Sequence, residues 1–453
     1  MFPGNLSRRG FIQRSLAAMT AAGLPLWYAQ SLLEGQLQAA EAAKKPLAAS
    51  DKIVVGLIGC GGQGRGILRQ ALNNKGVQVA AVCDVDAKRR DTAVAELSKN
   101  GNKVQGYEDF RELNDRKDLH AVLIGTPDHW HTLCSIDAMK KGKDVYCEKP
   151  LTLTVEEGRI LTKVAADSKA IFQVGSQQRS DARFRLAAEL VRNGRLGKIK
   201  RIETRIGSNP KGGPFKTEMV PEGLNWKFWQ GPVTKHVDYI KQRCHYEFRW
   251  WYDYSGGKMT DWGAHHNDQA QWALGMDDSG PIEVFGKGEK PSDNPNSYNC
   301  HPEFEVTYTY ANGATLVCMS KGENGVKYEG EDGKWIFVSR GLITASDEMT
   351  RPVKGKPGSG SKLLSEPLDK DAVKLYAVTN GHMNNFLDGI RSRKPCICTA
   401  EIGHRSVTVC HIGVISTRLG KKLKWDPTKQ QFDDAEANKM LSRPYGGGWK
   451  LEA

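Results

Sequence analysis

Three side chains of this sequence could carry acid–base chemistry: Lys149, Asp261 and His265. Lys149 follows a short apolar run, where a lysine can stabilise negative charge that develops on an oxygen. Asp261 and His265 are four residues apart in a helical pattern, which places them on one helix face. A carboxylate that orients an imidazole makes it a better general base. The set predicts proton removal from a hydroxyl group; a surface lysine and a structural Asp–His pair are the plainer interpretations.

A glycine-rich turn indicates a dinucleotide site. The stretch Gly59-Cys60-Gly61-Gly62-Gln63-Gly64 follows an apolar run at 53–58 and precedes a helical pattern. Gly59 permits a tight turn, Gly61 lets the backbone approach a pyrophosphate, and Gly64 lets helix and strand pack closely. The motif alone is weak evidence. Its place between a strand and a helix favours a cofactor over a plain glycine turn.

An acidic residue follows that turn at the spacing expected for a ribose contact. Asp84 ends the next apolar run, about 20 residues after the glycines. Its carboxylate would accept a hydrogen bond from the ribose 2′-hydroxyl and would repel a 2′-phosphate, so NAD is favoured over NADP. Arg89 and Arg90 lie close enough in the sequence to leave NADP open.

Strand and helix patterns alternate before residue 176. Strands are expected at 53–58, 77–83, 121–124, 144–147 and 171–174, with helices near 64–73, 87–99, 129–141 and 155–168. Near-continuous apolar strands between helices predict a parallel, doubly wound sheet. Such sheets bind ligands beyond the carboxyl ends of their strands, where Thr126, Pro127, His131 and Lys149 are expected. Asp128, in the same loop, has the character of a helix N-cap.

The pattern changes after residue 176. Asn312-Gly313 and Asp332-Gly333 favour tight hairpins, so an α+β domain with a largely antiparallel sheet is predicted. Residues 207–255 lack a clear period and predict a long ordered loop over a site. Strands are expected at 199–206, 282–287, 304–310, 315–321 and 334–339, and helices near 183–193, 261–274, 376–391 and 401–419.

The N-terminus has the features of an export signal. Arg8 and Arg9 precede a short apolar stretch, which is typical of the twin-arginine pathway. We therefore expect a periplasmic protein, with the export machinery as a partner and the leader excluded from the fold. The predicted division is a signal peptide at 1–42, an NAD-binding Rossmann domain at 51–176, a C-terminal α/β domain at 177–425 and a polar, loop-like tail at 426–453.

Composition narrows the remaining possibilities. The chain has 453 residues, a formal net charge of +13 and no apolar stretch long enough to span a bilayer. Its Lys and Arg residues are scattered and no nucleic-acid motif is present, so a solvated basic surface or an acidic carbohydrate substrate explains the charge. The ten cysteines have no metal-ligand spacing and are expected to be mostly free thiols. No metal is expected, although His265, His266 and Asp268 form a weak candidate set.

Taken together, the motifs resemble the glucose–fructose oxidoreductase / inositol dehydrogenase / MocA (Gfo/Idh/MocA) family from about residue 51 to 425. Glu148-Lys149-Pro150, Gly125-Thr126-Pro127 and the Asp261-xxx-His265 helix carry the resemblance. It implies a Rossmann domain followed by an open, largely antiparallel sheet, a homo-oligomer, and catalysis by Lys149 with Asp261 and His265. The implied cofactor contacts are Gly59, Gly61, Gly62, Gln63, Gly64, Asp84, Thr126, Pro127, His131, Glu148, Lys149 and, less strongly, Arg179.

The predicted function is an exported, NAD-dependent carbohydrate oxidoreductase. His265 would remove a hydroxyl proton, Asp261 would orient His265, and Lys149 would stabilise the alkoxide. Because no free nicotinamide pool is expected outside the cytoplasm, the cofactor should be tightly bound. One alternative is a redox-neutral glycosidase, lyase or epimerase that passes through a transient keto-sugar. A second alternative is a non-catalytic sugar-binding protein on the same scaffold.

Overall fold

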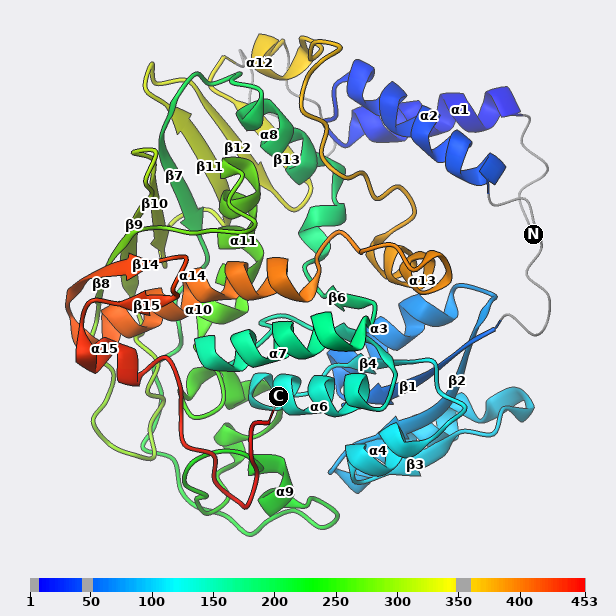
Figure 1. Cartoon of the computed structure of the whole chain (residues 1–453), viewed down its shortest axis with the longest axis vertical. Coiled ribbons are helices and arrows are strands. Elements are labelled where there is room, and N and C mark those ends of the chain that lie inside the picture. The colour runs from blue at the N-terminus through cyan, green and yellow to red at the C-terminus, as the bar shows by residue number, and fades with distance from the viewer. Residues whose placement is uncertain (1–7, 43–51, 348–359, 453) are drawn as a thin grey trace.

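Two sheets organise the molecule (Figure 1). The computed structural model describes residues 8–42, 52–347 and 360–452. A six-stranded sheet lies in the first part of the chain and a nine-stranded sheet in the second. Helix α14 (Ala400–Leu419) crosses the middle of the molecule, between the elements of the two sheets (Figure 1).

The first sheet is parallel, with strand order β3-β2-β1-β4-β5-β6. Apart from the short edge strand β3, its strands are mostly apolar and buried, as a sheet covered on both faces requires. The doubly wound sheet predicted from the sequence is confirmed, and only the short elements β3 and α5 had no predicted counterpart. The elements are β1 (Ile53–Ile58), α3 (Gly62–Leu72), β2 (Val77–Cys83), α4 (Ala87–Leu97), β3 (Gln105–Tyr107), α5 (Phe110–Asp115), β4 (Ala121–Ile124), α6 (Asp128–Lys140), β5 (Asp144–Cys147), α7 (Val155–Ser168) and β6 (Phe172–Val174).

The second sheet is mostly antiparallel, as predicted, with order β13-β12-β11-β7-β10-β9-β8-β14-β15. Strands β7 and β10 run parallel to each other. Strands β11, β13, β14 and β15 were not predicted. The strands are β7 (Ile199–Arg205), β8 (Glu283–Gly288), β9 (Phe304–Thr309), β10 (Thr315–Met319), β11 (Gly325–Gly330), β12 (Trp335–Ser339), β13 (Leu342–Ala345), β14 (Lys422–Asp426) and β15 (Gln431–Phe432).

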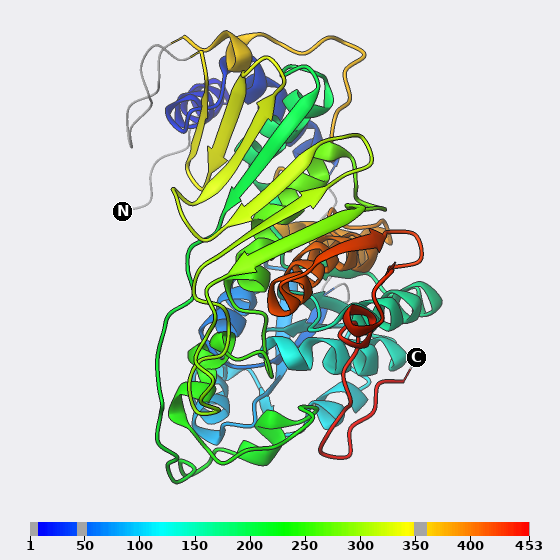
Figure 2. The ribbon, with the colours of Figure 1, turned by 90° about the vertical axis from the view of Figure 1, so that its left-hand side faces the viewer.

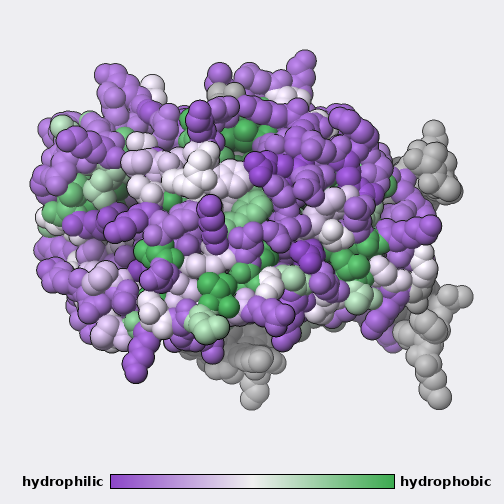
Figure 3. Space-filling model, turned by 90° about the horizontal axis from the view of Figure 1, so that it is seen from below, coloured by the Kyte–Doolittle hydropathy of each residue, from purple (hydrophilic) through white to green (hydrophobic). Residues whose placement is uncertain are grey.

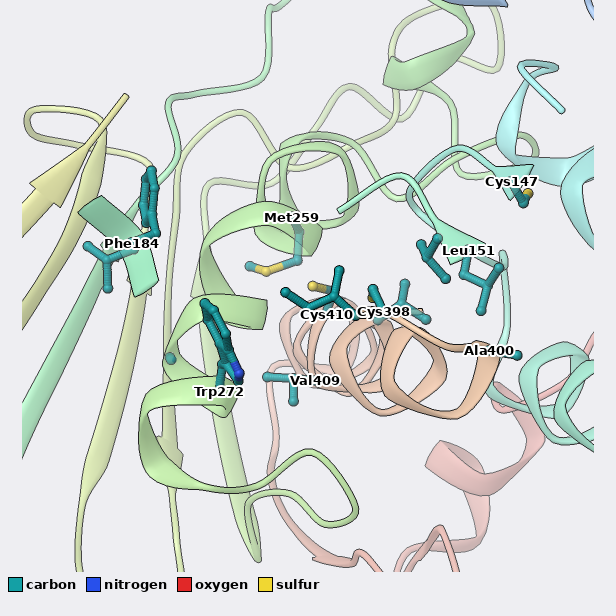
Figure 4. Close-up of a cluster of buried hydrophobic side chains, with 14 of the residues drawn as sticks. Cys147, Leu151, Phe184, Met259, Trp272, Cys398, Ala400, Val409 and Cys410 are labelled. Atoms are coloured by element: carbon teal, nitrogen blue, oxygen red, sulfur yellow. The ribbon is translucent and has the colours of Figure 1, made fainter. Parts of the chain in front are cut away.

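Helices cover the side of this sheet that faces the rest of the molecule (Figure 2). They are α8 (Ala182–Arg192), α11 (Gly263–Leu274) and α14, and their buried side chains join the sheet in one core. Figure 4 shows how this core continues to the first sheet, since Cys147 and Leu151 lie on one side of α14 and Met259 and Trp272 on the other. Helix α13 (His382–Ser392) packs against α3 and so covers part of the first sheet.

The long segment between β7 and α10 (Lys258–Asp261) has an aromatic core of its own. It contains α9 (Trp226–Gln230) and two 3₁₀ turns at Lys241–Arg243 and His245–Trp250. Its buried aromatic side chains are Trp226, Trp229, Tyr239, Phe248, Trp250, Trp251 and Tyr254. The ordered loop expected at 207–255 is therefore a packed unit, which we call the insertion.

The N-terminal segment packs against the second sheet's helices, although the sequence predicted that it would lie outside the fold. Helices α1 (Arg8–Ala21) and α2 (Leu26–Ala42) form a hairpin. Tyr28 is buried, and Arg185 of α8 donates a hydrogen bond to its hydroxyl oxygen at 2.7 Å. The apolar residues that resemble an export signal therefore also bury surface here. None of the described helices is long and apolar enough to cross a membrane.

The C-terminal residues are also ordered, in contrast to the loop-like tail that was predicted. Strand β15 and helix α15 (Ala435–Lys439) lie in this segment. Beyond them, the ring of Trp449 packs at 4.8 Å on that of Trp130 in α6. Viewed from below Figure 1, the surface is mainly hydrophilic, with hydrophobic residues in small separate patches (Figure 3).

Candidate active site

A cavity of about 490 Å³ lies at the carboxyl ends of the parallel strands. This is where a doubly wound sheet binds its ligands. The turns after β1, β2, β4 and β5 form one side, and the insertion, the α10–α11 region and the tip of the β12–β13 hairpin form the other. The polar lining residues most relevant to chemistry are Gln63, Asp84, Arg89, Asp128, Glu148, Lys149, Gln177, His245, Arg249, His265 and Arg340.

The glycine turn has the shape that a pyrophosphate needs. Gly59 has φ +93°, and a Cβ there would lie 2.7 Å from the backbone of Gly125. A Cβ on Gly64 would lie 1.8 Å from the Gly59 carbonyl oxygen, so helix and strand could not approach as they do. Gly61 and Gly62 line the cavity where α3 begins. The backbone N–H groups and dipole of this helix start favour an anion there.

Asp84 lies at the end of β2 and lines the cavity, as predicted for a ribose contact. Its carboxylate accepts hydrogen bonds from the backbone N–H groups of Cys60 (2.7 Å) and Asp86 (2.9 Å). Burial raises the pKa of Asp84, while these two N–H groups lower it. Arg89 also lines the cavity and lies 3.6 Å from the Asp86 carboxylate. Arg89, which could bind a 2′-phosphate, therefore already lies beside the carboxylate of Asp86.

The loop after β4 contributes three lining residues, Gly125, Thr126 and Pro127. His131 is buried behind them and does not line the cavity. Its two ring nitrogens lie 2.7 Å from the Pro150 carbonyl oxygen and 3.0 Å from that of Thr126. Burial lowers the pKa of His131 to about 4. His131 therefore positions two cavity-lining loops, rather than touching a ligand itself.

Glu148 is a buried carboxyl that faces the cavity. Gln177 donates a hydrogen bond to its Oε1 at 2.9 Å, and its Oε2 has no partner among the described residues. Burial raises the pKa of Glu148, and the charge of Lys149 opposes this rise. An unpaired oxygen in the lining is a group that a bound cofactor or substrate could satisfy.

Lys149 and Asp261 form a close ion pair. The lysine Nζ lies 2.7 Å from Asp261 Oδ1 and also donates to the Asp261 carbonyl oxygen at 3.0 Å. Arg249 Nε lies 3.4 Å from the same Oδ1. Burial would raise the pKa of Asp261, but the two adjacent cations outweigh it and hold the pKa below its usual range. The carboxylate is therefore ionised and committed to Lys149 and Arg249.

This arrangement corrects the expected Asp261–His265 pair. Helix α10 ends at Asp261 and α11 begins at Gly263, so the two residues do not lie on one continuous helix. His265 Nδ1 is buried with no hydrogen-bond partner among the described residues. Burial, followed by the charges of Lys149 and Arg340, lowers the pKa of His265 well below its ordinary value. The imidazole is neutral at pH 7 and can accept a proton.

Two sequence models of known oxidoreductases match this chain. Residues 53–176 match the NAD-binding Rossmann fold of the Gfo/Idh/MocA oxidoreductase family, and residues 212–451 match its C-terminal alpha/beta domain. The chain belongs to this family. The second match reaches residue 451 and so includes most of the segment at 426–453 that was predicted to be a tail.

Curated relatives in this family match part of the chain. An inositol 2-dehydrogenase of Burkholderia lata is 29% identical over 201 residues, which is 42% of this chain and 59% of that protein. A glycosyl hydrolase family 109 protein of Shewanella pealeana is 31% identical over 162 residues, covering 34% of this chain and 35% of that protein. The chain thus spans less than two thirds of the length of these relatives.

Solved structures share the fold over most of the chain. An aldose-aldose oxidoreductase from Caulobacter crescentus, complexed with glycerol, covers 82% of this chain and 99% of its own, with a TM-score of 0.61 and 19% identity. The WlbA dehydrogenase from Bordetella pertussis, in complex with NADH and UDP-GlcNAcA, covers 83% and 99%, with a TM-score of 0.60 and 16% identity.

Arg179 lies away from the cavity, so its position does not support the predicted cofactor contact. The guanidinium is fully buried and pairs at 2.7 Å with each of two carboxylates, Asp268 and Asp277. In the same region, His266 bonds to Asn324 at 2.9 Å. His266 and Asp268 thus bond to different residues, and His265 Nδ1 has no hydrogen-bond partner among the described residues, so the weak metal set considered from the sequence does not converge.

The insertion, predicted as a loop over the site, contributes Phe228, Trp229, His245, Tyr246, Phe248 and Arg249 to the cavity wall. The second domain adds Trp262 and Arg340, which were not predicted. Asp128, expected as a helix N-cap, is instead the first residue of α6 and accepts a hydrogen bond from Ser255 Oγ at 2.5 Å. Burial raises the pKa of Asp128 to about 7. Only the aromatic density of the insertion was a sequence signal for this wall.

Proposed function

We propose that this protein is an NAD-dependent oxidoreductase that acts on a ring carbon of a carbohydrate bearing a hydroxyl group. The observation that carries the proposal is the cavity itself. One end holds the glycine turn and Asp84, and the other holds the Lys149–Asp261 pair beside a neutral His265. The names of the inositol and aldose relatives support a polyol or sugar as the substrate class.

The roles follow from protonation states. His265 is neutral, so it accepts the proton of the substrate hydroxyl. Lys149 donates to that oxygen, and its charge stabilises the alkoxide. Asp261 acts through Lys149, which it holds by two contacts, rather than through His265. The nicotinamide, when bound, supplies the hydride acceptor for the carbon.

NAD fits the residues better than NADP. Gly61, Gly62 and Gln63 would hold the pyrophosphate, and the Asp84 carboxylate would accept a hydrogen bond from the ribose 2′-hydroxyl. A 2′-phosphate at Asp84 would meet a carboxylate, and Arg89 is already beside Asp86. Thr126, Pro127 and Glu148 would line the nicotinamide end. We further propose tight binding, such that NAD survives dialysis; weak binding of NAD, or tighter binding of NADP, would contradict this assignment.

The test is turnover on a sugar and polyol panel, read from the absorbance of the reduced nicotinamide. Lys149→Ala should lower turnover by at least about a hundredfold, because it removes the charge that meets the alkoxide, while NAD stays bound. Full activity of Lys149→Ala on a confirmed substrate would overturn the role. If sugars bind to the protein but never change the redox state of its cofactor, the sugar-binding alternative replaces the enzyme.

A redox-neutral reaction is the second candidate. Transient oxidation of a ring carbon acidifies the neighbouring C–H, and elimination or epimerisation then needs a second acid or base. Asp128 lines the same cavity, and its pKa of about 7 suits that task. The glycosyl hydrolase relative favours this chemistry. Mass spectrometry of products formed without added cofactor, in deuterated water, distinguishes the two reactions, because only the second incorporates deuterium at carbon without net oxidation.

We also propose export by the twin-arginine pathway and assembly as a homo-oligomer. Arg8-Arg9 before the apolar stretch supports the first, and the family resemblance supports the second. Replacing both arginines by lysine should retain the precursor in the cytoplasm in cell fractionation. A periplasmic protein in that variant would exclude the pathway, and a monomer by light scattering would exclude the oligomer.

A further inference from the structure

Arg340, from the second domain, adds a positive charge to the catalytic end of the cavity. It lies in the turn between β12 and β13, at the tip of a hairpin, and lines the cavity. Its guanidinium carbon lies 4.7 Å from the ring centroid of Trp262, the residue between α10 and α11. The hairpin therefore holds one guanidinium face against an aromatic ring, which leaves the N–H groups at its edge for another partner.

Every other cation of the cavity wall has an acidic neighbour. Lys149 and Arg249 share Asp261, and Arg89 lies beside Asp86. Arg340, in contrast, has no hydrogen bond or ion pair with any residue of the described ranges 8–42, 52–347 and 360–452, and the charges of Asp261, Asp181 and Glu148 act on it only from a greater distance. A guanidinium carries five N–H donors, so this is a large unused binding capacity in the lining.

The charges nearby also favour an incoming anion. Asp261 is neutralised by Lys149 and Arg249, and burial raises the pKa of Asp128 to about 7, so this carboxyl is only partly ionised at neutral pH. Partial burial lowers the pKa of Arg340 itself, and its charge lowers that of His265. The reacting end thus has an excess of positive charge in a partly desolvated space, where charge interactions are stronger than in water.

We propose that Arg340 binds a carboxylate of the substrate, so that the preferred substrate is an acidic sugar. This inference rests on the proposed function for the site. A planar guanidinium with a free edge matches a carboxylate through two parallel N–H···O bonds, which fix orientation as well as affinity. The position of Arg340 beside Trp262 and His265 means that the carboxylate would fix which ring hydroxyl reaches the imidazole.

Binding of methyl glycosides to the NADH-loaded protein tests this directly, because the reduced cofactor cannot accept a hydride and a methyl glycoside has no free aldehyde to receive one. Calorimetry would compare the methyl glycosides of D-glucuronate, D-galacturonate and D-mannuronate, each with that of its parent aldose. At least one acid should bind about tenfold to a hundredfold more tightly than its parent. Arg340→Gln should remove this advantage, and Arg340→Lys should keep part of it, because lysine supplies charge without the planar fork.

Arg69→Gln is the matched control, since it removes the same charge from an exposed position on α3 outside the cavity. It should leave the preference unchanged, and both variants should unfold at the wild-type temperature. The inference is overturned if no acid binds more tightly than its parent, or if Arg340→Gln keeps the full advantage. Reduction of NAD⁺ is scored separately: an Arg340-dependent preference without reduction would refute the proposed function alone, and reduction without a preference would refute this inference alone.

Discussion

The partner of Asp261 decides how the catalytic groups are held, and two double-mutant cycles can identify it. The first cycle combines Lys149→Met with Asp261→Asn, and the second combines His265→Gln with Asp261→Asn. Each cycle compares the two single variants with the double variant, so it isolates the interaction between the two side chains. The sequence alone favoured Asp261–His265, whereas the structure places Asp261 on Lys149.

The expected coupling energies follow from the geometry. Lys149 Nζ and Asp261 Oδ1 are 2.7 Å apart, and their side chains are 14% and 11% exposed. A hydrogen bond between charged groups contributes about 1.5–3 kcal/mol. Because Arg249 remains 3.4 Å from the same oxygen, we expect a coupling of about 2 kcal/mol in the first cycle. His265 is neutral, so the second cycle should give less than about 0.5 kcal/mol.

Urea unfolding of the cofactor-free proteins at pH 7 provides the free energies, followed by tryptophan fluorescence and far-ultraviolet circular dichroism. The transitions from the two probes must coincide for the cycle to be valid. A coupling of Asp261 with His265 that equals or exceeds its coupling with Lys149 would refute the assignment. It would restore the carboxylate–imidazole pair that the sequence pattern predicted.

Three further substitutions have expected outcomes. Gly64→Ala should destabilise the protein by about 1–3 kcal/mol and weaken NAD binding, because the added Cβ would overlap a backbone oxygen. Gly66 has open space around it, so Gly66→Ala is the control and should be neutral or stabilising. Urea unfolding measures the stability of both variants, and calorimetry measures their NAD binding. Asp128 has a folded pKa of about 7 against 3.8 as its ordinary value, so the folded state keeps a proton that the unfolded state has lost, and stability should fall as pH rises from 4 to 7. In Asp128→Asn, this pH-dependent loss of stability should be smaller by up to roughly 4 kcal/mol. The prediction is contradicted if the melting temperatures of the two proteins change with pH by the same amount. Trp449→Ala should cost about 2 kcal/mol, because the ring packs on Trp130 in the cavity wall; an unchanged melting temperature would mean that the C-terminal segment is not anchored there.

The first half of the fold could be predicted because each of its signals is local. Apolar runs, glycines and an acid at fixed spacing specify a strand, a turn and a ribose contact without reference to the rest of the chain. Gly59, Gly64 and Asp84 accordingly lie where the pattern places them. Lys149 and His265 also reach one cavity, as the resemblance implied, although 116 positions separate them in the sequence numbering.

The parts that could not be predicted depend on contacts between distant elements. Spacing put Asp261 and His265 on one face, but the helix breaks at Trp262, and Lys149 and Arg249 supply stronger partners for the carboxylate. Arg340 had no signal, because only the first strand of its hairpin, β12, was predicted, and β13 after the turn was not. Roles of single residues such as these depend on tertiary packing, and the periodicity of a sequence does not show which distant residues come into contact.

The insertion contacts both ends of the cavity. At the cofactor end, its backbone bonds to the loop after β2: Ala87 N–H donates to the Gly223 oxygen at 2.9 Å, and Asn225 N–H donates to the Val85 oxygen at 3.0 Å. At the catalytic end, Arg249 reaches Asp261, the residue that holds Lys149. Between these anchors the segment packs around its own aromatic core. The element that shapes the substrate space therefore shares a carboxylate with the catalytic lysine, so a change in the insertion that moves Arg249 should alter turnover as well as substrate preference.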